Sequence, residues 1–404
     1  MSKPTILAAI DVGTTKVCTI IAEVGENGGM RVVGVGITPS NGLHKGLVSN
    51  INDAKESIRA SIRKAEHVSG YKVESAYVGV TGRHVTSLNN RGVVTIARND
   101  RLVRPEDLKR VLQSAQSTKI PTDRKLLHVI PRGYAVDGQV GVKNPIGMHG
   151  LRLDVEAHVI TGAIASVQNL TKCIRGVGID IEDLILEPLA SSEAVLTQEE
   201  RQNGVMLADI GGGTTDIAIF KDGSIWHTAV LPVAGYQLTR DIAIGLGLPF
   251  DVAEEMKKQH GSVMPVYEGK RETDSKVGEN GHGVSYQALC DILRARTEEM
   301  IRLIQLELPR SGESLVPAGL VLTGGSSKLH GMDILGREIL KLPVRIGSPA
   351  HMPGISDALY DPAYATAVGL LLWGVKNEGT QSRKFRGFNT GLWNLVSRLW
   401  SLFH

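Results

Sequence analysis

One short pattern occurs twice in this chain: an apolar strand, an aspartate, a turn of glycine and threonine, and a second apolar strand. The first copy, residues 10–16, reads IDVGTTK, and the second, residues 208–216, reads ADIGGGTTD. The flanking apolar runs predict that each turn is the tip of a β-hairpin; these runs are residues 6–10 and 17–22 in the first copy, and 205–208 and 217–220 in the second. The repeat predicts two similar α/β halves that face each other across a cleft.

The residue types in these turns suit phosphate binding. Glycines let backbone N–H groups approach phosphate oxygens closely, and threonine hydroxyls supply further donors. Asp11 and Asp209 stand at the strand ends and are predicted to hold Mg²⁺ through water, because this ion keeps much of its hydration shell. A single turn of this kind is more often structural, so it is the repetition that favours a clamp for one nucleotide.

Composition limits the classes of function. The 404 residues predict two or three domains, and the net charge of +3 is too small and dispersed to indicate nucleic-acid binding. Cys18, Cys173 and Cys290 lie far apart and indicate neither zinc nor a disulfide framework. The apolar run before Asp11 is too short for a signal peptide, and no apolar stretch approaches the roughly 20 residues that span a bilayer. We expect a reducing, cytoplasmic setting.

A third small-residue turn follows the apolar strand predicted at residues 320–323. Gly324, Gly325 and Ser326 leave room for a flat base or ribose to lie on the backbone, although such a turn by itself is more often a helix entry. Glu254 and Lys257 share one face of the helix predicted over residues 249–260 and could reach the sugar and the base edge. The alternative for this pair is a solvated salt bridge.

The stretch from about residue 83 to residue 158 changes character and predicts an inserted subdomain. Strands predicted at residues 93–97, 126–130 and 151–160 surround a helix that begins at Pro105, where a proline followed by acids favours an N-terminus. Further along, residues 261–285 are rich in glycine and charge and predict a loop, and residues 286–308 predict a long helix with one apolar stripe.

The end of the chain has a different character. Residues 376–390 are polar and basic and predict a flexible linker, and residues 391–404 predict a short amphipathic helix. Its apolar side carries Leu392, Trp393, Leu395, Val396, Leu399, Trp400, Leu402 and Phe403. A tryptophan-bearing helix behind a basic linker favours an anchor in the headgroup zone of an anionic membrane. The alternative is a helix docked on the protein's own core or on a partner.

With two phosphate hairpins, a Thr-Gly-Gly turn and an insertion in the first half, the chain resembles the superfamily of actin, hexokinase and the heat-shock chaperones. Within it, the chain resembles the FtsA family of bacterial actin-like cell-division proteins. Three segments discriminate most: residues 45–51 (KGLVSNI), 78–84 (VGVTGRH) and 144–153 (NPIGMHGLRL) ahead of His158. The last two bracket the subdomain that is peculiar to this family. The resemblance extends from Ala8 to Leu372 and includes the tail.

The resemblance implies an actin-like ATPase fold: two ribonuclease H-like halves around a nucleotide cleft, an FtsA-type inserted subdomain and a C-terminal amphipathic helix. The implied division of the chain is subdomain 1A at residues 1–84, 162–195 and 348–375, subdomain 1C at residues 85–161, subdomain 2A at residues 196–228 and 309–347, subdomain 2B at residues 229–308, the linker at residues 376–390 and the helix at residues 391–404.

The site residues implied by the resemblance follow its motifs. The ATP-binding residues are Asp11, Gly13, Thr14, Thr15, Lys16, Asp209, Gly211, Gly212, Gly213, Thr214, Thr215, Glu254, Lys257, Gly324, Gly325 and Ser326. Glu187 begins the interdomain connection that places a polar group near the attacking water in relatives that hydrolyse ATP, and Asp209 joins it as a catalytic candidate through Mg²⁺. Whether Glu187 orients water or only caps a helix stays open. The expected turnover is at most slow.

The implied function is a scaffold at the division septum. Such a protein binds ATP and Mg²⁺, polymerises through actin-like contacts, meets further division proteins, and attaches peripherally to the cytoplasmic face of the membrane. It tethers the tubulin-like protein FtsZ there by receiving the FtsZ C-terminal peptide on subdomain 2B. Residues 264–283 depart from the family pattern in that subdomain.

Three alternatives belong to the same superfamily. A small-molecule kinase needs a carboxylate base and a hydroxyl-binding pocket, for which the sequence offers no convincing candidates. A pilus-assembly protein like PilM and a cell-shape actin like MreB share the nucleotide turns. Residues 144–153 and the tail argue against both of these.

Overall fold

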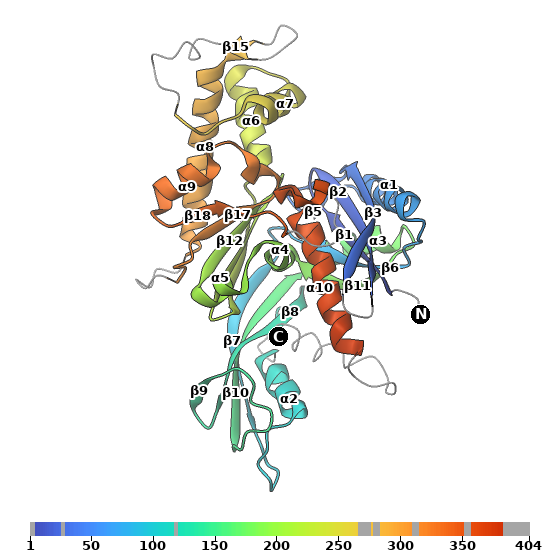
Figure 1. The fold of residues 1–404 in the computed structure, drawn as a ribbon, viewed down its shortest axis with the longest axis vertical. Coiled ribbons are helices and arrows are strands. Elements are labelled where there is room, and N and C mark those ends of the chain that lie inside the picture. The colour runs from blue at the N-terminus through green and yellow to red at the C-terminus, as the bar shows by residue number, and fades with distance from the viewer. Residues whose placement is uncertain are drawn as a thin grey trace.

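The structure is a computed structural model of the chain, and it describes residues 5–25, 29–116, 120–265, 276–277, 283–308, 315–350 and 357–382. The molecule is elongated (Figure 1). Two five-stranded sheets occupy its middle, a helical part made by residues 235–260 and 286–306 extends at one end, and a four-stranded sheet with one helix extends at the other.

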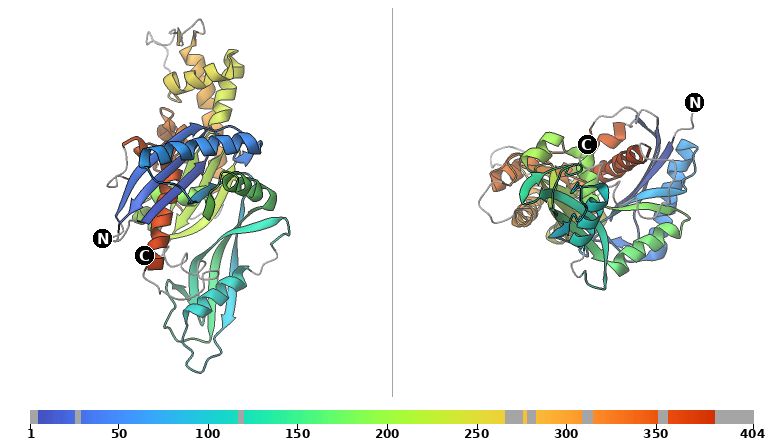
Figure 2. Two further views of the ribbon diagram at one scale, coloured as in Figure 1. Left: turned by 90° about the vertical axis from the view of Figure 1, so that its right-hand side faces the viewer. Right: turned by 90° about the horizontal axis from the view of Figure 1, so that it is seen from below.

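The first half of the fold is a five-stranded sheet. Its strands, in sheet order, are β11 (Asp180–Leu186), β6 (Ser75–Val80), β1 (Thr5–Val12), β2 (Lys16–Val24) and β3 (Met30–Pro39). β1, β2 and β3 are antiparallel neighbours, whereas β6 and β11 run parallel to β1. Helices α1 (Ile51–Ser69) and α3 (Ile164–Arg175) cover one face, as Figure 2 shows for α1.

The second half repeats this topology. Its strands, in the corresponding order, are β18 (Val344–Ile346), β17 (Leu320–Thr323), β12 (Val205–Ile210), β13 (Thr215–Lys221) and β14 (Ser224–Leu231). β12, β13 and β14 are antiparallel neighbours, and β17 and β18 run parallel to β12. Two sheets with the same order and directions confirm the prediction of two similar halves.

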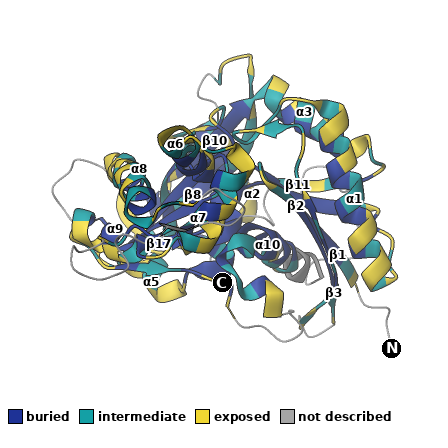
Figure 3. Ribbon diagram, turned by 90° about the horizontal axis from the view of Figure 1, so that it is seen from above, coloured by how far each residue is buried: buried dark blue, intermediate teal, exposed yellow. Residues whose placement is uncertain are grey.

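Two helices lie between the sheets and join them into one core. α4 (Glu187–Val195) and α10 (Ala365–Ser382) pack against Leu7 and Ala9 of the first sheet and against Leu207 and Ala218 of the second. They also cross each other closely, since a Cβ added at Gly369 of α10 would overlap the backbone oxygen of Ala190 in α4. In Figure 3 the strands are mostly buried, while α1 and α5 (Gln198–Asn203) show exposed outer faces.

Helix α10 corrects the predicted linker. The polar composition predicts flexible chain from residue 376, but the helix continues to Ser382. Extending a formed helix costs little compared with nucleating one, and Lys376 forms an ion pair with Glu193 of α4. Residues 383–404, which include the rest of the predicted linker and the whole predicted membrane helix, lie outside the described residues.

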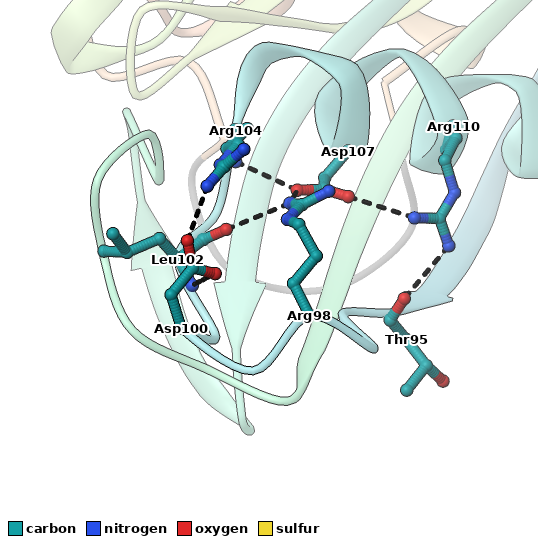
Figure 4. A network of polar contacts seen from close by, with 7 residues as sticks. All are labelled: Thr95, Arg98, Asp100, Leu102, Arg104, Asp107 and Arg110. Carbon is teal, nitrogen blue, oxygen red and sulfur yellow. Dashed lines mark hydrogen bonds and ion pairs between the residues drawn. The ribbon is translucent and has the colours of Figure 1, made fainter.

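The predicted insertion is a separate sheet. Its strands, in sheet order, are β7 (Thr86–Thr95), β10 (Arg152–Ala163), β8 (Arg124–Val136) and β9 (Gln139–Val142), and helix α2 (Pro105–Gln116) packs on it. The start of α2 is held by Asp107, a buried carboxylate that accepts hydrogen bonds from the side chains of Arg98 and Arg110 and from the backbone of Arg104 (Figure 4). This network fixes the end of the insertion farthest from the two halves.

The remaining helices belong to the second half. α6 (Gly235–Leu246), α8 (Tyr286–Leu306) and α9 (Met332–Leu340) contribute to one apolar core with β12, and α7 (Phe250–His260) packs beside α6. The segment predicted as a loop, residues 261–285, lies partly outside the described residues and contains the paired strands β15 (Lys276–Val277) and β16 (Val284–Ser285). The division of the chain into named subdomains remains a prediction.

Candidate nucleotide-binding site

The two repeated turns are built in the same way. The β1–β2 turn is closed by the Gly13 N–H donating to the Lys16 carbonyl at 3.0 Å, and the β12–β13 turn by the Gly211 N–H donating to the Thr214 carbonyl at 2.9 Å. Each turn is therefore the tip of an antiparallel hairpin, as the sequence predicts.

The tips of the two hairpins touch each other. A Cβ added at Gly212 would overlap the side chain of Thr15, and one added at Gly213 would lie 2.5 Å from the Thr14 hydroxyl. Glycine is required in the second turn because the threonines of the first turn occupy the space of a side chain. The structure thus brings the two predicted phosphate turns into one place.

Four buried carboxylates lie around these tips: Asp11 of β1, Asp209 of β12, Asp216 of β13 and Glu187 at the start of α4. Burial raises the pKa of Asp11 to about 6, with Lys16 lowering it and Asp209 raising it, and burial raises the pKa of Asp216 to about 7 against a hydrogen bond from Thr81. The pKa of Glu187 lies well above its usual range because of burial and repulsion from Asp11 and Asp216. These groups form one electrostatically linked cluster.

Asp216 is the residue that the sequence analysis missed. It is paired directly with Asp209 across the β12–β13 ladder, at the position that Cys18 occupies opposite Asp11 in the first hairpin. Two like charges facing each other across a ladder destabilise it unless something compensates. The aspartate at the end of the ADIGGGTTD motif was therefore a usable signal.

Hydroxyl groups from three other elements hold these carboxylates in place. Ser191 of α4 donates to Asp209, and Thr366 of α10 donates to the same oxygen at 3.0 Å. Thr81, which follows β6, donates to Asp216 and so links the first half to the second. The bonds from Ser191 and Thr366 lower the pKa of Asp209, but burial has the larger effect and the pKa is still raised. None of the three hydroxyl residues was predicted as a site residue.

Carboxylate oxygens are the ligands that a hydrated divalent cation prefers. Lys16 lowers the pKa values of Asp11 and Asp209, but its ammonium donates to the Ala363 carbonyl and lies 4.6 Å from the centre of the Tyr364 ring. Within the described ranges, no three His, Cys, Asp or Glu side chains are placed to hold a metal together. Asp11 and Asp209 are the residues that would hold Mg²⁺, with water completing its shell. The ion would supply the positive charge that the cluster lacks.

The third turn lies against the second. A Cβ added at Gly324, whose φ is +84°, would overlap the Asp209 carboxylate, and Gly325 begins the short 3-10 helix η1 (Gly325–Lys328). The Ser326 hydroxyl donates to the Gly211 carbonyl at 2.8 Å. The structure therefore places all three predicted turns together around Asp209.

Glu254 and Lys257 of α7 lie next to this group and bind each other. Their side chains form an ion pair at 2.7 Å, and the Lys257 ammonium also donates to Thr239 at 2.8 Å and to the Gly235 carbonyl at 3.2 Å. A Cβ added at Gly235 would meet Ser326, which connects the pair to the third turn. The salt bridge considered as the alternative is thus present, and it is partly buried beside the predicted nucleoside side of the site.

The carboxylate cluster predicts a pH dependence of stability. The pKa of Asp216 is raised from its ordinary value of 3.8 to about 7 in the folded protein. The folded state therefore binds the proton more tightly, and the free energy of unfolding falls as pH rises from about 4 to about 7. His84 and His158, whose pKa values burial lowers to about 4 and about 3, act in the opposite direction below pH 6.5. Asp216→Asn removes this proton-binding group. We therefore expect the free energy of unfolding of the variant, relative to that of the wild type, to be higher at pH 8 than at pH 5 by roughly 1–4 kcal/mol.

Urea unfolding at both pH values in the presence of EDTA measures this difference. The same experiment with excess Mg²⁺ should reduce the difference between wild type and variant, because the ion stabilises the ionised carboxylates of the wild type. If the free energy of unfolding depends on pH in the same way in wild type and variant, the electrostatic linkage of the four carboxylates is contradicted.

Comparisons with known proteins identify the family of this chain. A family model described as Cell division protein FtsA matches residues 206–369, and one described as the SHS2 domain inserted in FTSA matches residues 82–161. The Cell division protein FtsA of Pseudomonas aeruginosa is 45% identical over 376 residues, which cover 92% of this chain and 90% of the relative. The chain belongs to the FtsA family.

Solved structures show that this FtsA-family chain has an actin-like fold. A chain of the PilM-PilN type IV pilus biogenesis complex gives a TM-score of 0.65 at 20% identity, covering 92% of this chain and 99% of that one. MreB5 of Spiroplasma citri bound to ADP gives a TM-score of 0.57 at 14% identity, and the match covers 94% of this chain and 99% of that one. At these identities the likeness shows the fold alone, so PilM and MreB are similar to this chain in architecture. The match of the inserted domain and the identity to FtsA relatives place the chain in the FtsA family.

In the part of this FtsA-family chain that the structure describes, no helix is both long and apolar enough to cross a bilayer. The predicted membrane residues from Leu392 to Phe403 lie outside that part.

Proposed function

We propose that this FtsA-family protein binds ATP with Mg²⁺ between its two halves, polymerises through actin-like contacts and tethers FtsZ filaments to the cytoplasmic membrane at the division septum. The observation that carries the proposal is the meeting of two glycine-threonine turns over four buried carboxylates. Glycine turns suit phosphate oxygens, and a cluster of buried acids suits the Mg²⁺ that accompanies a nucleoside triphosphate.

The nucleotide is proposed to lie with its base toward α7 and its phosphates over the two turns. Gly324, Ser326, Glu254 and Lys257 gather beside Gly211, which gives the site a nucleoside end. MreB5 of Spiroplasma citri, which has a similar fold, was solved bound to ADP, and this supports a nucleotide as the ligand. Glu187 begins α4 between the sheets and is the residue proposed to orient water.

The FtsZ C-terminal peptide is proposed to bind subdomain 2B, residues 229–308. Several large apolar side chains of that region are exposed, among them Tyr236 of α6 at 36% and Phe250 of α7 at 43%, whose ring centres lie 5.1 Å apart. Exposed apolar side chains close together on one helical unit suit an amphipathic peptide. Residues 391–404 are proposed to bind anionic lipid through their apolar and tryptophan side.

Sedimentation with anionic liposomes tests the proposal as a whole. We expect the full chain to pellet with the liposomes, and more strongly with ATP and Mg²⁺, because polymerisation joins many weak anchors into one particle. A chain ending at Arg386 should stay in the supernatant and still bind ATP by calorimetry. If the full chain does not pellet, the anchor is wrong; if neither chain binds ATP, the nucleotide site is wrong.

A further inference from the structure

A small hairpin lies across the junction of the two halves, next to the nucleotide turns. Its strands are β4 (Leu43–His44) and β5 (Leu47–Val48), and Lys45 and Gly46 form its two-residue turn with φ values of +48° and +72°. This conformation favours asparagine, aspartate or glycine at both positions, so a lysine is strained there. Strain of this kind persists where the surrounding structure fixes the backbone.

The hairpin is held firmly by the first half. The backbone N–H groups of Ser49 and Asn50 donate to the Gly42 carbonyl at 2.8 and 3.1 Å, and the Asn50 side chain caps the start of α1. At its tip, the Gly46 N–H donates to the Thr14 hydroxyl in the first phosphate turn at 3.1 Å. The position of the tip is therefore set by rigid elements.

The same tip touches the second half. A Cβ added at Gly213 would lie 3.0 Å from the Cα of Lys45, so the backbone of Lys45 borders the second phosphate turn. The preceding residue, His44, meets Tyr236 of α6 edge-on, with ring centres 5.7 Å apart. Lys45 is thus placed where the two phosphate turns meet.

Lys45 also differs from Lys16 in how its charge is used. The Lys16 ammonium is engaged by the Ala363 carbonyl and the Tyr364 ring. Lys45 is half-buried as a residue, and no hydrogen bond or ion pair within the described residues involves its ammonium. A lysine on a four-carbon stem with three donors suits a phosphate as a point charge.

The position of Lys45 along the second turn indicates which phosphate it would meet. Ser326 and Gly235 contact the Gly211 end of this turn, which is the nucleoside end of the proposed site, whereas Lys45 borders Gly213. Gly46, at the tip of the hairpin, also lines a cavity of about 20 Å³ together with Thr81 and Glu187, which is room for about one water molecule. The tip of the hairpin therefore lies at the end where a terminal phosphate and an attacking water would be.

We propose that Lys45 binds the terminal phosphate of the nucleoside triphosphate and so makes the site prefer a triphosphate to a diphosphate. The inference rests on the proposed function, because it needs a nucleotide in this site. The left-handed turn presents the lysine, α1 fixes the turn, and Thr14 links it to the first phosphate clamp.

Two substitutions at Lys45 separate its charge from its backbone. Lys45→Asn removes the charge and keeps a residue that favours the turn, and Lys45→Arg keeps the charge. Lys109→Asn in α2, far from the site, is the control. Calorimetry of the full chain with Mg²⁺ measures the affinity for ATP and for ADP in each protein, and thermal unfolding confirms that each is folded.

We expect Lys45→Asn to weaken ATP binding on the order of tenfold to a hundredfold, the effect of one charge-assisted hydrogen bond, and to leave ADP binding within about twofold. Lys45→Arg and Lys109→Asn should bind both nucleotides like the wild type. An equal loss for ATP and ADP, or no loss, would overturn the assignment of Lys45. A wild type that binds neither nucleotide would instead overturn the proposed function, and this inference with it.

Discussion

Gly212→Asp is expected to abolish measurable ATP binding, with a loss in affinity of at least about a hundredfold. The new Cβ would overlap the side chain of Thr15 in the facing turn, so the two tips must separate. The added carboxylate would also join four buried acids and repel the phosphates; like charges in a site of low dielectric cost several kcal/mol. Calorimetry with ATP and Mg²⁺ measures the effect.

Gly29→Asp is the control for this change. Gly29 is exposed, and a Cβ added there meets nothing within 4 Å, so the same charge at this position should leave ATP affinity unchanged. Thermal unfolding must show that both variants fold. An unchanged affinity in a folded Gly212→Asp protein would mean that the second turn does not contact the nucleotide.

The double substitution Trp393→Glu and Trp400→Glu is expected to abolish liposome binding. Each change places a carboxylate on the apolar side of the predicted terminal helix, at a cost of roughly a few kcal/mol in the apolar layer. Together these costs exceed what one short amphipathic helix gains from burial. Co-sedimentation with anionic liposomes measures the loss, and ATP affinity should not change.

Asn394→Glu with Ser401→Glu adds the same charge on the opposite, polar side of that helix. This control should weaken binding by repulsion from anionic lipid, roughly 1 kcal/mol for each charge, without abolishing it. Equal losses in both double variants would show that net charge alone drives the attachment. Normal sedimentation of the tryptophan variant would show that residues 391–404 are not the anchor.

Much of the site was predictable because its parts are local. Each turn, with its aspartate, glycines and threonines, is specified within a few residues by the change from apolar strand to glycine, and its repetition predicts the paired halves. The insertion was predictable from a change in pattern between residues 83 and 158. The extent of α10 was not, because the polar residues after Trp373 have no apolar periodicity, and Lys376 is held by Glu193, which is distant in sequence.

The sequence by itself determined the two hairpin turns, the carboxylates Asp11 and Asp209 at their ends, the inserted subdomain and the amphipathic pattern of the tail, because each depends on neighbouring residues. Only the tertiary structure decided that the turns touch, that Thr81 of one half binds Asp216 of the other, and that Lys45 borders Gly213. These contacts join residues far apart in the chain. They form when α4 and α10 pack between the two sheets and bring the hairpin tips together, and no local pattern encodes that packing.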